Sequence, residues 1–334
     1  MSTIVDVARM ANVSRATVTR VLNEPEKVKE ETKLRVENAI RLLNYKPNLS
    51  ARSLVSKSSG VIGMLIPNNV SGFFGSVMSA VHKEVNAKGK MLMVLESAGQ
   101  AEEENALRKL DEINCDGFLL YTRHLSTETI KAYTENKPVV LLDASGSADI
   151  HSVSFDHYLS AFDATNKLIA AGHKKIAVIG GPDSRYSASQ RLKGCIDAIR
   201  AVNKEWGDEY YIQGSYDHVF GEKATLTLIE RKLDMTAIVY CGERACSGGL
   251  KTLRLQGLSV PDDISVISFD SFGLTEYLAP HIDSVVYPVK EMAEYGAREI
   301  LMKLTRKDYV IQSRQFPHSF IEGQSISQVR DASR

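Results

Sequence analysis

The fold at the start of this chain is decided by the stretch Asp6-Val-Ala-Arg-Met-Ala-Asn-Val-Ser-Arg-Ala-Thr-Val-Thr-Arg-Val-Leu22. It predicts two short helices broken by one tight turn at Asn12 and Val13, the pattern of a helix-turn-helix. The i, i+3, i+4 spacing in the second helix predicts a buried face made of Val18, Val21 and Leu22. The opposite face carries Arg15, Ala16, Thr19 and Arg20. The helix pair therefore presents two arginines outward.

Both helices begin with a local signal. Ser14 can cap the second helix, because its hydroxyl accepts from backbone N–H groups two or three residues later. Thr3 with Asp6 resembles a capping box for the first. A helix-turn-helix places the start of its second helix in the DNA major groove, where arginine pairs with guanine. Arg15 and Arg20 could both reach base edges, and the alternative is an ordinary solvated helix.

Length and charge indicate several domains with different partners. A chain of 334 residues is too long for one ordinary core and predicts two or three domains. The net charge is zero, which argues against a protein that coats nucleic acid along its whole length. Residues 1–58 carry eleven Lys or Arg against six Asp or Glu, so this segment is +5 and the remainder −5. Attraction to phosphates is thus concentrated in the first segment.

The cysteines and the apolar content exclude several other classes. Cys115, Cys195, Cys241 and Cys246 are too irregularly spaced for a zinc site, so we expect reduced, buried or half-buried thiols, no metal and no cofactor. No leader, lipidation motif or apolar run of about 18 residues is evident, which predicts a cytoplasmic protein without a membrane partner.

A third helix is expected over Glu30–Leu43, with Val36, Ile40 and Leu43 on one face. Asn44-Tyr-Lys-Pro47 ends it, because a residue before proline avoids the α region. The serine-rich stretch 48–59 that follows is either a plain linker or a helix too short to be stable alone.

At this point the order of motifs becomes specific. D-V-A-x-x-A-x-V-S-x-x-T-V-[ST]-R-V-L-N from Asp6, N-Y-x-P-N from Asn44 and A-R-x-L from Ala51 resemble the lactose-repressor (LacI/GalR) family. The resemblance implies base-reading positions at Arg15, Ala16 and Arg20. It implies phosphate-contacting or docking positions at Thr17, Thr19, Asn23 and Tyr45.

The resemblance also gives the serine-rich stretch a role. Residues from Asn48 to about Ser56 would match a hinge helix that orders only on the operator, with Asn48 and Ala51 among its DNA-binding positions. Leu54 would match a minor-groove wedge that unstacks a base step and bends the duplex. The alternative for Leu54 is a linker leucine packed on its own domain.

After Gly60, short apolar runs alternate with amphipathic segments. Strands are predicted at Val61–Ile66, Met91–Leu95, Gly117–Tyr121, Pro138–Asp143, Lys175–Gly180, near Tyr210, at Ala237–Tyr240 and at Ile264–Phe269. Helices are predicted around Val77–Ala87, Ala101–Ile113, Gln190–Val202, from Glu222 and at Leu250–Leu255. Apolar runs without alternation are typical of parallel strands covered on both faces, so two doubly wound α/β halves are expected.

With the family resemblance, the fold class becomes an all-α helix-turn-helix domain plus a periplasmic-binding-protein-like core of two such subdomains. The expected boundaries are 1–46 for the DNA-binding domain, 47–59 for hinge and linker, 60–155 with about 289–316 for the first core subdomain, and 156–288 with about 317–328 for the second, with the effector cleft.

Polar residues at strand ends are the candidates for a ligand site, because open α/β sheets bind ligands there. Asp143, Asp270, the segment Tyr121-Thr-Arg123 and Arg191 form a set that suits a polyol, since carboxylates accept from vicinal hydroxyls and arginine donates to them. Solvated loop ends are the alternative. The resemblance assigns Asp143, Arg191 and Asp270 to the effector and matches Phe73 and Phe74 to an N-P-F-F-like segment.

Two departures from the family pattern stand out. Gly242-Glu243 replaces the usual Asn-Asp pair at an effector-binding position, and Gly323 replaces an arginine in an R-x-S pattern. The effector is therefore expected to differ in shape, to bind weakly or to be absent. The segment Cys115–Ser126 resembles β-glucoside (AscG-like) repressors.

No enzyme can be assembled from the sequence. Gly180-Gly-Pro-Asp183 lacks a complete phosphate-loop motif, no G-x-S-x-G or H-E-x-x-H occurs, and His173 is expected to orient a loop. Catalytic residues are therefore not predicted.

These observations predict a transcriptional repressor that binds a pseudopalindromic operator as a homodimer and is controlled by a small effector, a sugar or sugar derivative. Effector binding between the subdomains would separate the hinges and lower operator affinity. Control by a protein partner, regulation without an effector, and activation remain alternatives. The tail after Glu322 lacks leucine heptads, so no tetramer-forming helix is predicted.

Overall fold

The computed structural model describes residues 2–23, 25–45, 58–67, 72–97, 99–144, 149–270 and 273–329. Two compact units, Met1–Gly60 and Val61–Arg334, make up the chain. The predicted hinge helix, with Asn48, Ala51 and Leu54, lies outside the described residues. None of the described helices is long and apolar enough to cross a membrane.

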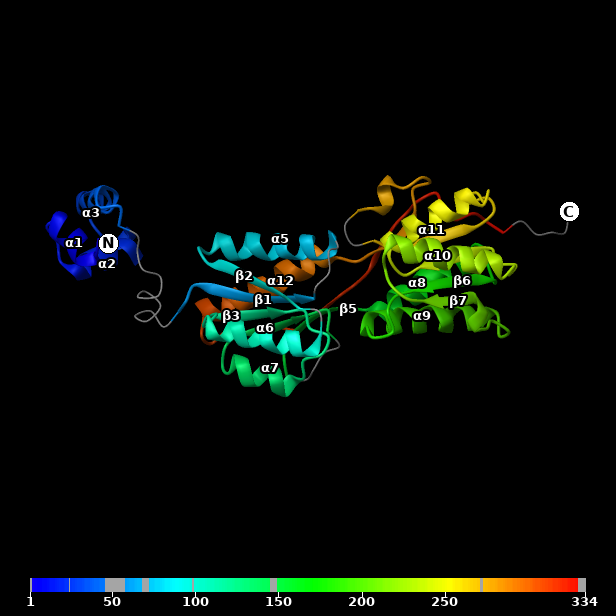
Figure 1. The fold of residues 1–334 in the computed structure, drawn as a ribbon, viewed down its shortest axis with the longest axis horizontal. Helices are drawn as coiled ribbons and strands as arrows, with labels where there is room; N and C mark the ends of the chain where they lie inside the picture. Colours follow the sequence, from blue (N-terminus) through cyan, green and yellow to red (C-terminus); the bar gives the residue numbers. More distant parts are fainter. Residues whose placement is uncertain are drawn as a thin grey trace. The chain divides into compact units, whose positions relative to one another are not determined.

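The described part of the first unit is helical (Figure 1). Its elements are α1 (Ile4–Met10), α2 (Arg15–Asn23), the 3-10 turn η1 (Pro25–Lys27) and α3 (Glu30–Leu42). The capping box is confirmed, because Asp6 N donates to Thr3 Oγ1 at 3.3 Å and Thr3 N to Asp6 Oδ2 at 2.9 Å. Ser14 caps α2 by accepting from Thr17 N at 3.0 Å. Asn12, at φ +52°, makes the turn between α1 and α2.

One apolar seam joins these helices. Val7 of α1, Val18 of α2 and Val36 of α3 have no exposed surface, and Leu22, Ile40 and Leu43 pack against them half-buried. The residues predicted to face inward therefore do so. A core this small gives the unit little stability of its own.

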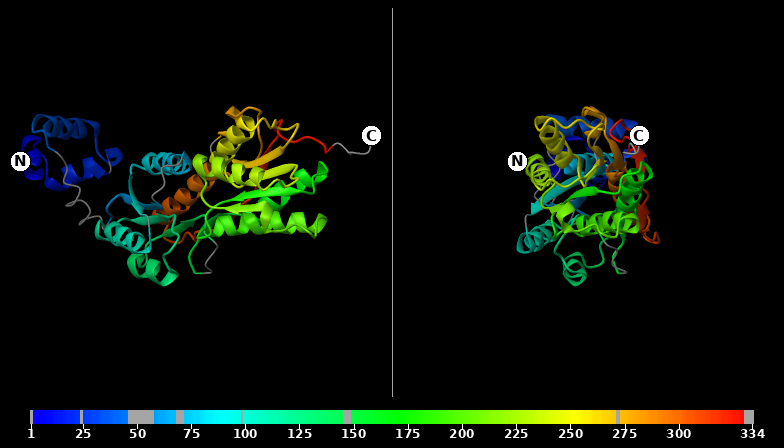
Figure 2. Two further views of the ribbon diagram at one scale, coloured as in Figure 1. Left: turned by 45° about the vertical axis from the view of Figure 1, so that its right-hand side comes forward. Right: turned by 90° about the vertical axis from the view of Figure 1, so that its right-hand side faces the viewer.

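The second unit contains two sheets, and helices cover both faces of each (Figures 1 and 2). The first sheet has the strand order β11-β5-β4-β3-β1-β2 and is parallel throughout. Its strands are β1 (Val61–Pro67), β2 (Met91–Ser97), β3 (Gly117–Leu120), β4 (Val139–Leu142), β5 (Ser152–Phe155) and β11 (Arg314–Phe316). Its helices are α5 (Gly72–Ala87), α6 (Gln100–Glu112), α7 (Thr127–Thr134) and α12 (Val289–Thr305). Helices α5 and α12 pack together on one face, with α6 and α7 on the other (Figure 1).

The second sheet has the order β12-β10-β9-β8-β6-β7, and only β12 is antiparallel to its neighbour among these described strands. Its strands are β6 (Ile176–Gly180), β7 (Tyr211–Gln213), β8 (Ala237–Tyr240), β9 (Ser265–Asp270), β10 (Asp283–Val286) and β12 (Ser319–Ile321). Its helices are α8 (His157–Ala170), α9 (Tyr186–Val202), α10 (His218–Glu230) and α11 (Glu243–Leu255), with 3-10 turns η2 (Asp208–Tyr210) and η3 (Thr275–Tyr277). The strand predicted near Tyr210 begins one residue later, after η2.

The chain passes between the sheets from β5 to α8, from β10 to α12 and from β11 to β12. All seven residues of β1 and all six of β9 are buried, which explains their uninterrupted apolar pattern. The predicted fold class is confirmed. The four cysteines are free and buried, as predicted. His173 links Thr236 Oγ1 and the Ser327 carbonyl at 2.9 and 3.0 Å, in the loop-orienting role expected of it.

Candidate functional site

The exposed face of α2 carries the first candidate site. Arg15, Ala16 and Arg20 are exposed, and neither guanidinium group forms a hydrogen bond or ion pair within the described residues. Buried Val18 and Val21 fix the opposite face of the same helix. The helix therefore holds two arginines in place with their donors available to a partner.

Several other residues predicted to contact DNA already make contacts within the protein. The Thr17 hydroxyl lies 2.9 Å from Ser14 Oγ, and Thr19 Oγ1 donates to the Arg15 carbonyl at 3.1 Å. Tyr45 is half-buried against the helical core. Asn23 is the last residue of α2. Thr17 and Tyr45 thus stabilise the unit, whatever else they contact.

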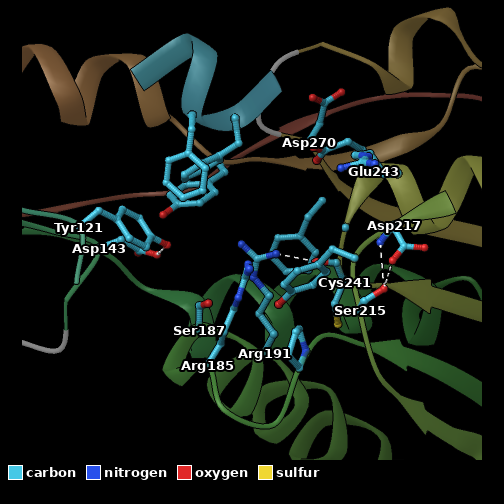
Figure 3. A pocket seen from close by; sticks show the side chains of 18 residues that line it. Tyr121, Asp143, Arg185, Ser187, Arg191, Ser215, Asp217, Cys241, Glu243 and Asp270 are labelled. Atoms are coloured by element: carbon cyan, nitrogen blue, oxygen red, sulfur yellow. Dashed lines mark hydrogen bonds between the residues drawn. The ribbon is translucent and has the colours of Figure 1, made fainter. Parts of the chain in front are cut away.

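The second candidate site is a cavity of about 250 Å³ in the second unit (Figure 3). It lies beyond the carboxyl ends of strands from both sheets, where open α/β folds place ligands. The first sheet and its helices contribute Phe73, Phe74, Tyr121 and Asp143. The second contributes Pro182, Arg185, Ser187, Arg191, Ser215, Tyr216, Asp217, Cys241, Gly242, Glu243, Arg244, Phe269 and Asp270, and Tyr287 follows β10. The structure thus brings together every residue predicted for the effector except Arg123, which does not line the cavity.

A buried hydrogen-bond network crosses from one subdomain to the other beneath this cavity. Asp143 follows β4 at φ +54°, a conformation that Asp tolerates better than most residues. Its carboxylate accepts from Tyr121 Oη at 2.8 Å and lies 2.8 Å from His157 Nε2. Arg191 Nε donates to His157 Nδ1 at 3.2 Å. Because arginine is always a donor, Nδ1 must be the acceptor, so His157 carries its proton on Nε2 and donates it to Asp143.

The charges in this network follow from its burial. Burial lowers the pKa of His157, and this outweighs the opposing effect of Asp143. Although burial works against its charge, Asp143 has a lowered pKa because His157 and tyrosine hydroxyls stabilise the carboxylate. Burial and the neighbouring Asp143 raise the pKa of Tyr121, so its phenol stays protonated and donates. The network at neutral pH is a neutral imidazole between a carboxylate and a guanidinium.

Aromatic rings form one wall of the cavity. Phe73 and Phe74 meet edge-to-face at 4.9 Å, and Tyr121 meets Phe74 in the same way at 5.1 Å. Tyr287 packs 5.4 Å from Phe73. Such faces suit the apolar C–H side of a sugar ring, while the polar residues opposite suit its hydroxyls.

Arg191 is held rigidly on the other side. It is 6% exposed, its guanidinium lies 4.1 Å from the centre of the Phe269 ring, and Nη1 donates to the Cys241 carbonyl at 2.6 Å. Asp270 is also committed to the protein, since it accepts from Gly273 N at 2.6 Å and from the backbone and hydroxyl of Thr275. Asp270 therefore shapes the loop after β9 as well as lining the cavity.

At both departures from the family pattern, a side chain would meet neighbouring atoms of the protein. A side-chain carbon at Gly242, the N-cap of α11, would lie 2.8 Å from the Tyr216 ring. One at Gly323 would lie 2.4 Å from Asp283 N and 2.5 Å from the His281 carbonyl. Tyr216 thus occupies the space that a side chain at 242 would need, and Gly323 packs directly on backbone.

Four residues that shape the site are not singled out by the sequence patterns above: His157, Arg185, Tyr216 and Glu103. Arg185 and Tyr216 follow β6 and β7, so the rule applied to other strand ends would have found them. His157 is recognisable only through its spatial neighbours. Buried Glu103 accepts from the Arg123 and His124 backbone N–H groups, both at 3.0 Å, and so holds the loop after β3.

Comparison with known proteins agrees with this architecture. Residues 59–319 match the family of periplasmic binding proteins and the sugar binding domain of the LacI family, and residues 3–48 match the bacterial regulatory proteins of the lacI family. The HTH-type transcriptional regulator AscG of Escherichia coli (strain K12) is 31% identical over 92% of this chain and 94% of its own. Catabolite control protein A of Priestia megaterium is 31% identical over 95% and 96%.

Among solved structures, the lac repressor dimer bound to operator and the anti-inducer ONPF aligns with a TM-score of 0.86. The alignment covers 98% of this chain and 99% of that one, at 24% identity, and shows the shared fold. The family matches span most of the sequence and include both units. This chain belongs to the LacI family of bacterial regulatory proteins.

Proposed function

We propose that this regulator represses transcription by binding a pseudopalindromic operator as a homodimer, with its DNA affinity set by a small ligand in the cavity. The observation that carries the proposal is the combination of two sites in one chain. An exposed pair of arginines lies on α2, and a polar, aromatic-walled cavity lies at the strand ends of the second unit.

Recognition of DNA would rest on α2. Arg15 and Arg20 have the donors to bind guanine edges, Ala16 can contact a thymine methyl group, and Thr19 and Asn23 lie on the same helix. One helix reads a short half-site, so a two-fold pair is needed for specificity. Thr17, Tyr45, Asn48, Ala51 and Leu54 remain predicted contacts.

A sugar-sized ligand fits the cavity. Its volume of about 250 Å³ lies just below the range of roughly 300–1,000 Å³ usual for drug-sized ligands. Phe73 and Phe74 would pack on the ring, with Asp143, Arg191 and Asp270 at its hydroxyls. Because both subdomains line the cavity, a bound ligand would favour one arrangement of the two subdomains over others. This shift would change the affinity of the DNA-binding unit for its operator.

The protein would act by binding and not by catalysis, since relatives such as AscG of Escherichia coli are transcriptional regulators. A regulator of this family that binds chromosomal DNA would act in the cytoplasm.

The test is selection from a random duplex pool by the full-length protein, followed by equilibrium binding to the selected duplex at fixed salt. We expect an inverted repeat bound by two chains. Failure to enrich any sequence would overturn the proposal. A selected site without two-fold symmetry would overturn the dimeric part of it.

A further inference from the structure

Three arginines line the cavity and a fourth lies next to it. Arg185, Arg191 and Arg244 line it, and Arg123 lies two residues after Tyr121, which also lines it. Within the described residues, none of the four guanidinium groups forms an ion pair. Buried or half-buried arginines are normally paired, because an uncompensated charge in a poorly solvated place costs free energy.

Arg123 is the one of the four whose side-chain donors are buried without a hydrogen-bond partner among the described residues. Its backbone is fixed by the bond from Arg123 N to Glu103 Oε1, yet its side-chain Nε and Nη2 are buried without a hydrogen-bond partner among the described residues. Burial and then the positive charge of Arg185 lower the pKa of Arg123, while Tyr121 and Glu103 act in the opposite direction. Arg123 follows a strand of the first sheet and Arg185 a strand of the second. The two positive charges therefore belong to different subdomains, one lining the cavity and the other two residues from Tyr121 in its wall.

Arg185 is also placed unfavourably with respect to its own helix. It is the N-cap of the 17-residue helix α9 and makes no side-chain capping bond. A positive charge there opposes the helix dipole, whose N-terminal end favours anions. Its side chain lies 5.5 Å from the Tyr216 ring, and Figure 3 shows it beside Arg191, directed into the cavity.

The four carboxylates that line the cavity interact with groups other than Arg123 and Arg185. Asp143 accepts from Tyr121 and His157, Asp217 caps α10 through Phe220 N at 2.8 Å, and Asp270 holds the Thr275 loop. Glu243 lies in the first turn of α11, where the helix dipole favours a negative charge. Within the described residues none of these four forms an ion pair with Arg123 or Arg185, so these two guanidinium groups have no direct carboxylate partner.

We propose that the effector is an anionic sugar derivative whose phosphate or carboxylate group binds between Arg185 of the second subdomain and Arg123 of the first. This inference rests on the proposed function and specifies its ligand. An anion between the two arginines would replace repulsion by attraction and draw the subdomains together. The ligand's charge would then drive the conformational change, while its ring and hydroxyls would supply shape selectivity.

The test is calorimetric titration of the full-length protein, without DNA, with matched sets of ligands. Each set contains a neutral hexose, its 6-phosphate and its uronic acid, which separate phosphate from carboxylate. We expect at least one anionic member to bind about tenfold or more tightly than its neutral parent, and this preference to fall as salt is raised.

Single substitutions then test which arginines bind the anionic group of the ligand. Arg185→Gln and Arg123→Gln should each reduce affinity for the anionic ligand by about 10- to 100-fold and leave the neutral parent's affinity within about twofold. Arg200→Gln is the matched control, because Arg200 is exposed in the last turn of α9, the helix that Arg185 caps, and does not line the cavity. This variant should change the affinity for the anionic ligand little. The comparison separates a direct contact from the long-range electrostatic field of the protein. Thermal unfolding of the free variants checks that they fold.

If no anionic member binds better than its neutral parent, or if Arg200→Gln reduces affinity as much as Arg185→Gln, the inference is overturned. A neutral sugar that binds more tightly than its anionic forms and lowers operator affinity would overturn it and leave the proposed function standing.

Discussion

His157 Nε2 lies 2.8 Å from Asp143 Oδ1, and this contact joins the start of α8 to the strand end of the other sheet. The same imidazole accepts from Arg191, so a change in its protonation would break one bond of the pair. The contact lies where the chain passes between subdomains. It therefore joins a charged residue of the cavity wall to the segment by which the chain crosses between the subdomains.

The first prediction concerns pH. Because burial lowers the pKa of His157 below its usual 6.5, the unfolded chain takes up this proton first on acidification. Its contribution is fully present above about pH 6.5 and is lost as pH falls toward the folded-state pKa. Lowering of the Asp143 pKa acts only at much lower pH, below its usual 3.8. Urea unfolding between about pH 8 and pH 5 should show stability falling on the acid side.

His157→Gln should flatten this profile. Burial also lowers the pKa of His173, so part of the slope should remain. His82→Gln on α5 removes an exposed histidine and should leave the profile as in the parent. An unchanged slope in His157→Gln would show that the imidazole is not neutral in the folded state.

The second prediction concerns close helix packing. A Cβ at Gly248 of α11 would lie 2.0 Å from the His218 carbonyl at the start of α10, so Gly248→Ala should force these helices apart. We expect a loss of about 1–3 kcal/mol of unfolding free energy. Gly75 of α5 has no atom within 4 Å of such a carbon, and Gly75→Ala should stabilise by about 0.5–1 kcal/mol. Equal effects from denaturant unfolding would mean that the helices do not pack as described.

The third prediction concerns base recognition. Arg20→Ala should cost about 1–3 kcal/mol on the selected operator and relax preference at one position of each half-site. Arg35→Ala removes the same charge from an exposed position on α3 and should change affinity without changing the preferred sequence. Binding to a set of single-position operator variants measures both. Intact preference in Arg20→Ala would remove this side chain from the reading face.

The fourth prediction separates two roles of Asp270. Asp270→Asn leaves one oxygen for donors from Gly273 and Thr275, so unfolding free energy should fall by about 1–3 kcal/mol. Thr275→Val removes only the hydroxyl donor to the same carboxylate and should perturb the loop less. If Asp270 also binds the effector, Asp270→Asn should lose far more ligand affinity than its loss of stability explains. Parallel losses in the two variants would confine Asp270 to holding the loop.

Most of the fold can be predicted from local signals in the sequence. The capping residues Ser14 and Thr3 predict the starts of their helices, and the uninterrupted apolar pattern of β1 reflects burial on both faces of the sheet. Strand ends then pointed to Asp143 and Asp270, because parallel strands bring their carboxyl ends to one edge.

What the sequence could not show depends on distant segments meeting. His157 gains its role only from Asp143 and Arg191, which lie 14 and 34 residues away. The replacement at Gly242 looked like the loss of a ligand contact, whereas the structure shows Tyr216 filling that space. No local sequence pattern shows that the ring of Tyr216 lies where a side chain at position 242 would be.

The central claim is that the cavity controls DNA binding, and operator affinity with and without the ligand tests it most directly. We predict that a saturating ligand identified by calorimetry weakens operator binding by about 5- to 150-fold, and that the operator weakens ligand binding by the same factor. Asp143→Asn should abolish this response while still binding operator. A ligand that saturates the cavity and leaves operator affinity unchanged would contradict the account.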